Sequence, residues 1–115
     1  MWHNISSVAE LNTIISDAGS GTGKFNLILK HSTRCSVSSM AKNRIEKNPD
    51  ARINYYIINV ISNRDVSNAL ADSTGVRHES PQALLFNGSS LVDVTSHSAI
   101  RPAEISERVD SLIQI

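Results

Sequence analysis

Two apolar segments, residues 24–31 (KFNLILKH) and 52–61 (RINYYIINVI), are each followed by a segment with helical spacing. Short runs that are this apolar favour strands buried on both faces of a sheet. The helical segments run from Cys35 to the Asn-Pro-Asp stop at 48–50, and from Ser62 to Gly75. Because strands that alternate with helices need crossover connections, the two strands should lie parallel with helices covering the sheet. This alternation predicts an α/β fold.

The rest of the chain extends the pattern in both directions. The other predicted elements are a short strand at 1–5, a helix over 5–19, strands at 82–86 and 90–95, and a helix over 101–115. Ser7 and Glu10 have the spacing of a capping box, and Pro102 suits the first turn of the last helix. Asn87-Gly88 is a strong hairpin signal, so the last two strands should pair antiparallel. We therefore predict a single domain with a mixed sheet, central parallel strands and a C-terminal antiparallel hairpin.

The charged residues argue against two classes of partner. Eleven Lys and Arg residues balance eleven Asp and Glu residues, and no block of like charge occurs. Such a chain lacks the electrostatic footprint of a protein that binds nucleic acid or an anionic membrane. No apolar run approaches the roughly 20 residues of a membrane helix, and the N-terminus lacks a secretory signal pattern. We expect a cytoplasmic protein that binds neither nucleic acid nor membranes.

The segment GSGTGK, residues 19–24, looks at first like a phosphate-binding loop. Such a loop needs glycine where Ala18 stands and Ser or Thr where Phe25 stands, and it leads from a strand into a helix. This segment leads from a helix into a strand, so we interpret it as a helix stop and turn. The histidines show no metal-ligand spacing, and we interpret His31 and His78 as solvent-facing loop residues, the alternative being that folding brings them near Cys35. The four histidines are His3, His31, His78 and His97.

The only cysteine, Cys35, stands at the start of the helix after the first buried run. A free cysteine is often a small buried hydrophobic residue, which is the alternative to a reactive thiol. The position favours a reactive thiol, because the unpaired amides and positive dipole of a helix N-terminus stabilise a thiolate. Lys30, His31 and Arg34 are close in sequence and could add to this positive field. Ser38, three residues on, cannot form a disulfide with Cys35 and can at most donate a hydrogen bond to it.

A cysteine after a central strand, in a Cys-x-x-Ser frame and with a later Ser-Pro before a hairpin, resembles the thioredoxin superfamily. A closer resemblance is to the YtxJ-type family, the monothiol bacilliredoxins of the bacillithiol redox system. The segments that carry it are HSTRCSVSSMA at 31–41, YYIINVISNRDVSNALADSTGVRHESPQALLF at 55–86 and SHSAI at 96–100. The likeness extends over nearly the whole chain, and the middle segment is far more specific than Cys-x-x-Ser. One position departs from the pattern, because Ser36 stands where proline is typical.

The resemblance implies a thioredoxin-like three-layer sandwich in which Cys35 is the nucleophile and Ser38 and Arg34 support its thiolate. It also implies an activity, the removal of bacillithiol from mixed disulfides on S-thiolated client proteins. Pro81 would be a cis-proline that faces the cysteine, and the backbone of Ser80 would pair with the client. The resemblance implies no tightly bound cofactor and no metal, with bacillithiol as a low-molecular-weight co-substrate. The candidate residues for binding its carboxylates and hydroxyls are Thr33, Arg34, Ser36, Arg77 and His78.

Two other functions stay open. A glutaredoxin-like iron-sulfur cluster carrier could bridge a cluster between two Cys35 thiolates, but Ser36 and Val37 replace the middle of the Cys-Gly-Phe-Ser pattern of such carriers. A non-catalytic stress or binding protein on a thioredoxin-like scaffold would leave the thiol inert. The identity of the small thiol is also open, because glutathione or coenzyme A could replace bacillithiol.

Overall fold

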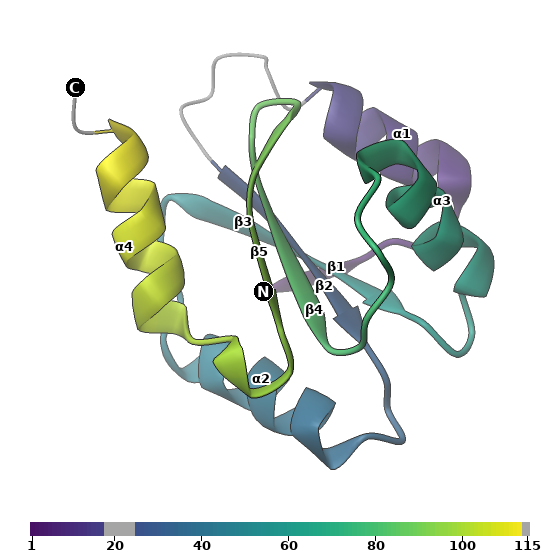
Figure 1. Ribbon diagram of the computed structural model, residues 1–115, viewed down its shortest axis with the longest axis horizontal. Helices are drawn as coiled ribbons and strands as arrows, with labels where there is room; N and C mark the ends of the chain where they lie inside the picture. Colours follow the sequence, from purple (N-terminus) through teal and green to yellow (C-terminus); the bar gives the residue numbers. More distant parts are fainter. Residues whose placement is uncertain (18–24, 114–115) are drawn as a thin grey trace.

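The computed structural model describes residues 1–17 and 25–113 and has a five-stranded sheet with helices on both faces (Figure 1). The elements in chain order are β1 (Trp2–Asn4), α1 (Val8–Asp17), β2 (Phe25–His31), α2 (Ser36–Lys47), β3 (Ile53–Asn59), α3 (Arg64–Thr74), β4 (Gln82–Asn87), β5 (Ser90–Ser96), the 3-10 helix η1 (His97–Ala99) and α4 (Pro102–Ile113). The strand order is β1-β3-β2-β4-β5. The predicted mixed sheet is confirmed, and the turn predicted over 19–24 lies outside the described residues.

The β2 strand forms the centre of the sheet, and all seven of its residues are buried. It pairs in parallel with β3 and antiparallel with β4, where Lys30 lies opposite Gln82. The β4–β5 pair is the predicted antiparallel hairpin, and β1 adds a short parallel strand beside β3. The carboxyl end of β2 therefore meets the amino end of β4. We call this end of the sheet the β2 carboxyl end.

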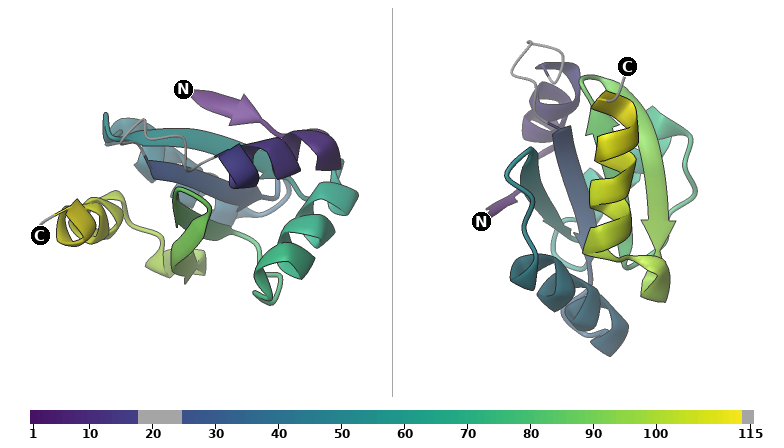
Figure 2. Two further views of the ribbon diagram at one scale, coloured as in Figure 1. Left: turned by 90° about the horizontal axis from the view of Figure 1, so that it is seen from above. Right: turned by 90° about the vertical axis from the view of Figure 1, so that its left-hand side faces the viewer.

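Two apolar cores lie on opposite faces of the sheet, as expected from the alternation of side chains along a strand. Leu27 and Leu29 belong to a cluster with residues of α2 and α4, whereas Ile28 belongs to a cluster with residues of α1 and α3. The two helix pairs lie on either side of the sheet in Figures 1 and 2. The molecule therefore has three layers, with β2 buried from both sides.

Two glycines have positive φ, one at the end of a helix and one in a hairpin turn. Gly75 has φ 71° at the end of α3, and Gly88 has φ 63° in the turn between β4 and β5. Both positions favour glycine, which has no Cβ to clash in this conformation. The sequence did not predict η1, in which His97 has φ 55°. Among the described helices, none is long and apolar enough to cross a membrane.

Candidate functional site

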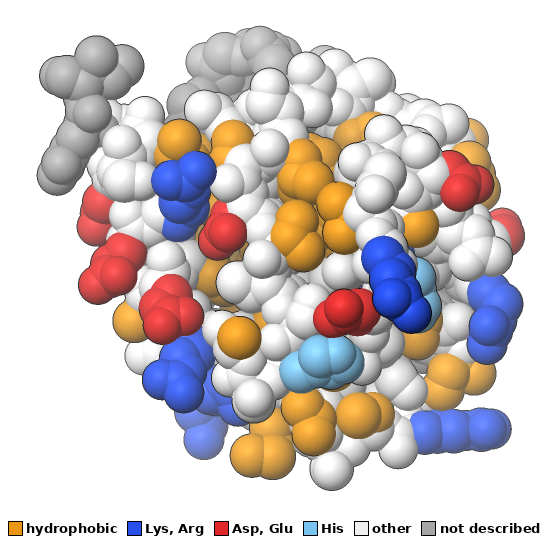
Figure 3. Space-filling view, viewed as in Figure 1, with side chains coloured by type: hydrophobic (Ala, Val, Ile, Leu, Met, Phe, Trp, Pro, Cys, Tyr) orange, Lys and Arg blue, Asp and Glu red, His pale blue; other side chains and the backbone are white. Residues whose placement is uncertain are grey.

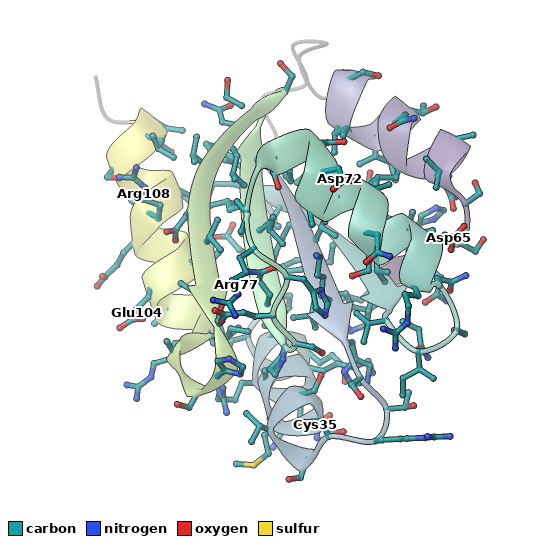
Figure 4. All side chains as sticks on the ribbon, turned by 45° about the vertical axis from the view of Figure 1, so that its right-hand side comes forward. Cys35, Asp65, Asp72, Arg77, Glu104 and Arg108 are labelled. Carbon is teal, nitrogen blue, oxygen red and sulfur yellow. The ribbon has the colours of Figure 1, made fainter. Side chains whose placement is uncertain are left out.

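Cys35 lies between the last residue of β2 and the first residue of α2 (Figure 4). It is the N-cap of this 12-residue helix, with extended backbone angles of φ −112° and ψ 120°. The Ser39 N–H donates to the Cys35 carbonyl at 3.1 Å, whereas the thiol side chain caps no amide. The free thiol is partly exposed. The predicted helix start is thus located beside the cysteine, at the positive end of the helix dipole.

Ser38 joins the first turn of α2 to the end of β2. Its side chain is fully buried, and its Oγ accepts the Ser32 N–H at 3.0 Å and lies 2.5 Å from His31 Nδ1. In the described part of the chain, no hydrogen bond joins Ser38 to Cys35. The Ser38 hydroxyl therefore has two partners other than the thiol that we expected it to support.

His31 is not a solvent-facing loop residue, so that expectation was wrong. The β2 strand continues through position 31, and the imidazole is only 7% exposed because it lies beneath α2 against Ser38. Burial lowers the pKa of His31, and nearby Lys42 lowers it further, while Glu46 opposes these effects. The predicted strand at 24–31 already included His31, so strand alternation, and not loop exposure, was the better guide to its surroundings.

The Lys30 side chain lies on the other face of the sheet from His31, toward α3. Its side chain is fully buried, and its Nζ donates to the Ser67 carbonyl at 3.1 Å and lies 3.2 Å from His78 Nδ1. His78 Nδ1 also lies 3.1 Å from Ser67 Oγ. His78 is exposed, but one of its ring nitrogens is held by a buried lysine, which the interpretation as a free loop histidine missed.

The segment before β4 brings the predicted proline to the β2 carboxyl end. The Ser80–Pro81 peptide bond is cis, and Pro81 is buried with its carbonyl accepting the His97 N–H at 2.9 Å. The Gln82 side-chain amide donates to the Arg77 carbonyl at 3.1 Å. These bonds fix the segment at the end of the sheet from which the Cys35 loop also emerges.

The remaining residues of the predicted site are exposed on two segments of the chain. Thr33 and Arg34 precede Cys35, Ser36 begins α2, and Arg77 lies on the loop before β4. Figure 4 labels Cys35 and Arg77, one from each segment. The structure places both segments at the β2 carboxyl end, but it shows no direct hydrogen bond between them in the described residues. They can form two sides of one binding surface.

The sequence did not predict that large apolar side chains are exposed on α2 and after β3. Val37 and Met40 on α2 are 38% and 59% exposed, and Ile61, which follows β3, is 40% exposed. Figure 3 shows hydrophobic side chains gathered at the lower edge of the molecule, where α2 lies. Within residues 1–17 and 25–113, no three His, Cys, Asp or Glu side chains gather closely enough to hold a metal ion.

Comparison with solved structures defines the class of protein. A candidate oxidoreductase described as having a thioredoxin fold superposes with a TM-score of 0.81 at 29% identity, over 93% of this chain and 92% of the other. Thioredoxin from Trypanosoma brucei brucei gives 0.76 at 10% identity, over 100% and 93% of the two chains. A mutant thioredoxin from Halobacterium salinarum NRC-1 gives 0.73 at 19% identity, over 99% and 92%. The protein has the thioredoxin fold.

A protein-family model identifies the family of this chain. The model described as Monothiol bacilliredoxin BrxC matches residues 3–105. The chain belongs to the monothiol bacilliredoxin family. Together with the fold, this membership supports a thiol redox protein, as the resemblance implied.

Proposed function

We propose that this protein is a monothiol thiol-disulfide exchange enzyme that removes bacillithiol, or a similar low-molecular-weight thiol, from mixed disulfides on client proteins. The observation that carries the proposal is the position of Cys35, a partly exposed free thiol at the N-cap of α2. Thiol-disulfide exchange needs an accessible thiolate that can approach a disulfide in line with the S–S bond. At the start of α2 the Cys35 sulfur is partly exposed, so a client disulfide can approach it from solvent.

The reaction needs two exchange steps. In the first, the Cys35 thiolate attacks the small-thiol sulfur of the client mixed disulfide, so that a new S–S bond forms on Cys35 and the client leaves as a thiolate, which takes a proton from solvent. In the second, the thiolate of another small thiol attacks the small-thiol sulfur on Cys35. This releases Cys35 as a thiolate and one symmetric disulfide of the small thiol. The oxidising equivalents move from the client to that disulfide, and reduced small thiol is the reductant.

Ser38 fits a monothiol mechanism because it has no sulfur that could resolve the adduct. Its hydroxyl instead bonds His31 and Ser32. The mixed disulfide on Cys35 should therefore persist until an external thiol arrives. A reducing compartment supplies such a thiol, so we place the reaction in the cytoplasm.

We propose separate contacts for the two parts of the substrate, the client protein and the small thiol. The exposed apolar side chains of Val37, Met40 and Ile61 would contact the client protein, with the backbone of Ser80 and the ring of Pro81 beside its disulfide. The small thiol would contact the polar side chains that flank Cys35 and those on the facing loop. These are Thr33, Arg34, Ser36, Arg77 and His78.

The experiment uses a client protein that carries bacillithiol on one cysteine. The client is mixed with wild-type protein or with Cys35→Ala, and both are followed by intact-mass spectrometry under non-reducing conditions. We expect the small thiol to appear on wild-type protein, at Cys35, while the client loses it. Equal loss of the client adduct with wild type and Cys35→Ala would overturn the proposal.

The same preparation tests the alternatives that the sequence left open. An inert thiol would give no adduct on Cys35 and slow alkylation, which would favour a non-catalytic binding or stress protein. A visible absorption band after anaerobic reconstitution with iron and sulfide would favour a cluster carrier. An adduct on Cys35 in protein purified without reductant would identify the small thiol by its mass.

A further inference from the structure

A buried lysine contacts a histidine at the rim of the proposed substrate surface. The Lys30 side chain is fully buried, and in the described part of the chain its amino group has two polar neighbours, the Ser67 carbonyl at 3.1 Å and His78 Nδ1 at 3.2 Å. Lys30 lies opposite Gln82 in the sheet, and Gln82 directly follows Pro81 of the cis bond. The residues join β2, α3 and the loop before β4.

The contact determines which nitrogen of a neutral His78 carries the proton. An ammonium group has only protons to donate, so Nδ1 must accept if the Lys30–His78 contact is a hydrogen bond. The Ser67 hydroxyl, 3.1 Å from the same nitrogen, can also donate to it. With Nδ1 an acceptor, the ring proton lies on Nε2, which takes part in no hydrogen bond in the described residues. The exposed nitrogen of His78 then presents an N–H group at the rim.

We propose that Lys30 is a positioning residue that holds the proton of neutral His78 on Nε2, where it donates to an anionic group of the small thiol. The inference rests on the proposed exchange activity and adds to it a positioning residue, Lys30, and the atom through which His78 would bind an anionic group of the small thiol. Burial lowers the pKa of Lys30, and while the amine stays protonated this cation behind the ring also favours a negative charge in front of it. A neutral thiol of similar size would gain nothing from this contact.

The charged groups around His78 set the pH dependence. Burial lowers the pKa of His78, nearby Lys30 and Arg64 lower it further, and Glu79 opposes them. As the pH falls through that lowered pKa, His78 gains a second proton and a positive charge, so the preference for an anionic thiol should increase. Removing the Lys30 charge raises the pKa of His78. As the pH is lowered, the preference for an anionic thiol should then begin to increase at a higher pH than in wild type.

The first measurement is independent of activity. Two-bond proton–nitrogen correlation spectra of the full-length protein distinguish the two tautomers of each histidine. We expect His78 to carry its proton on Nε2 in wild type and in Ser67→Ala, which keeps the lysine. In Lys30→Met the Nδ1–H form should appear, since that proton can then be donated to Ser67 Oγ.

The second measurement compares two small thiols on one client peptide. Mercaptosuccinate carries two carboxylates, and thioglycerol is neutral and of similar size. Mass spectrometry follows the transfer of each small thiol from the peptide to Cys35. The control variant is His3→Gln, because His3 lies on the edge strand β1, away from the proposed site. At a pH above the His78 pKa of each protein, where the ring is neutral, we expect the anionic-to-neutral ratio of second-order rate constants to fall about tenfold in Lys30→Met and in His78→Gln. The control should keep the wild-type ratio.

The outcomes separate this inference from the proposed function. If neither thiol is transferred to wild-type protein, the exchange activity fails, whatever the tautomer. If both are transferred and the ratio is the same in wild type, Lys30→Met and His78→Gln, His78 does not bind the anionic group and the exchange activity stands. A proton on Nδ1 in wild type would show that Lys30 is a neutral acceptor and would overturn the positioning role. That last result needs no variant, so it holds even if Lys30→Met fails to fold.

Discussion

Removing the Ser38 hydroxyl should destabilise the fold more than its small size suggests. In Ser38→Ala, the Ser32 N–H loses its acceptor at 3.0 Å and the buried His31 Nδ1 loses its partner at 2.5 Å. Leaving a buried polar group without a partner costs about 1–3 kcal/mol, which applies in full to the buried His31 ring and only in part to the N–H of the half-buried Ser32. The higher helix propensity of alanine returns about 0.5 kcal/mol. We expect a net loss of about 2–3 kcal/mol in the free energy of unfolding.

Urea denaturation measures this loss, and Ser36→Ala is the matched control. Ser36 is exposed in the same helical turn, so the control repeats the change in helix propensity without removing a buried hydrogen bond. Surface substitutions of this kind usually stay within about 0.5 kcal/mol. For a domain of this size, the Ser38→Ala loss corresponds to a melting temperature lower by roughly 10 °C.

The two variants together test whether the Ser38 hydroxyl joins β2 to α2. A Ser38→Ala protein as stable as Ser36→Ala would mean that the hydroxyl does not join β2 to α2. A second readout is the His31 ring, whose NMR signals should change in Ser38→Ala and stay unchanged in Ser36→Ala. Equal His31 spectra in both variants would contradict the contact directly.

Further predictions concern the redox chemistry, the acid stability and the core. Ser38→Cys should place a second thiol beside His31 and resolve the Cys35 adduct internally, so mass spectrometry should detect an intramolecular disulfide in place of a lasting mixed disulfide. Hydrogen bonds from Arg52 hold the pKa of Asp50 far below its usual value. The ionised form of Asp50 therefore adds stability above about pH 4, and this stability is lost as the pH falls. In urea titrations, Asp50→Asn should lower the free energy of unfolding by about 1 kcal/mol at neutral pH and by progressively less in acid. Leu84→Ala should cost about 3 kcal/mol in the same assay, because Leu84 is only 1% exposed in the core under α1 and α3.

The sequence predicted the fold well because its elements carry strong local signals. The β2 strand has an apolar run on both faces, α3 ends at Gly75, and Asn87-Gly88 forms the hairpin turn, as each pattern indicated. The 3-10 helix η1 was missed because three residues provide no periodicity. Its position depends on the Pro81 carbonyl, which accepts the His97 N–H and lies far away in the sequence.

The polar partners in the site could not be predicted from spacing. His31 and Lys30 are adjacent in the sequence, yet β-strand alternation directs their side chains to opposite faces, toward α2 and toward α3. Only the register between β2 and β4 places Lys30 near the loop that carries His78. Long-range pairing of this kind leaves no mark in a local pattern, so the sequence could identify the thiol but not the residues that surround it.

The position of Ser38 connects the fold to the monothiol chemistry. In a two-cysteine enzyme, the residue at this position must keep its sulfur free to attack the first cysteine. Here the side chain is fully buried and its oxygen bonds the end of β2, so it contributes to stability in place of redox chemistry. A serine at this position has no sulfur, so it cannot resolve an adduct on Cys35. In the proposed exchange, release would therefore depend on an external thiol, and the residues that bind that thiol would determine specificity.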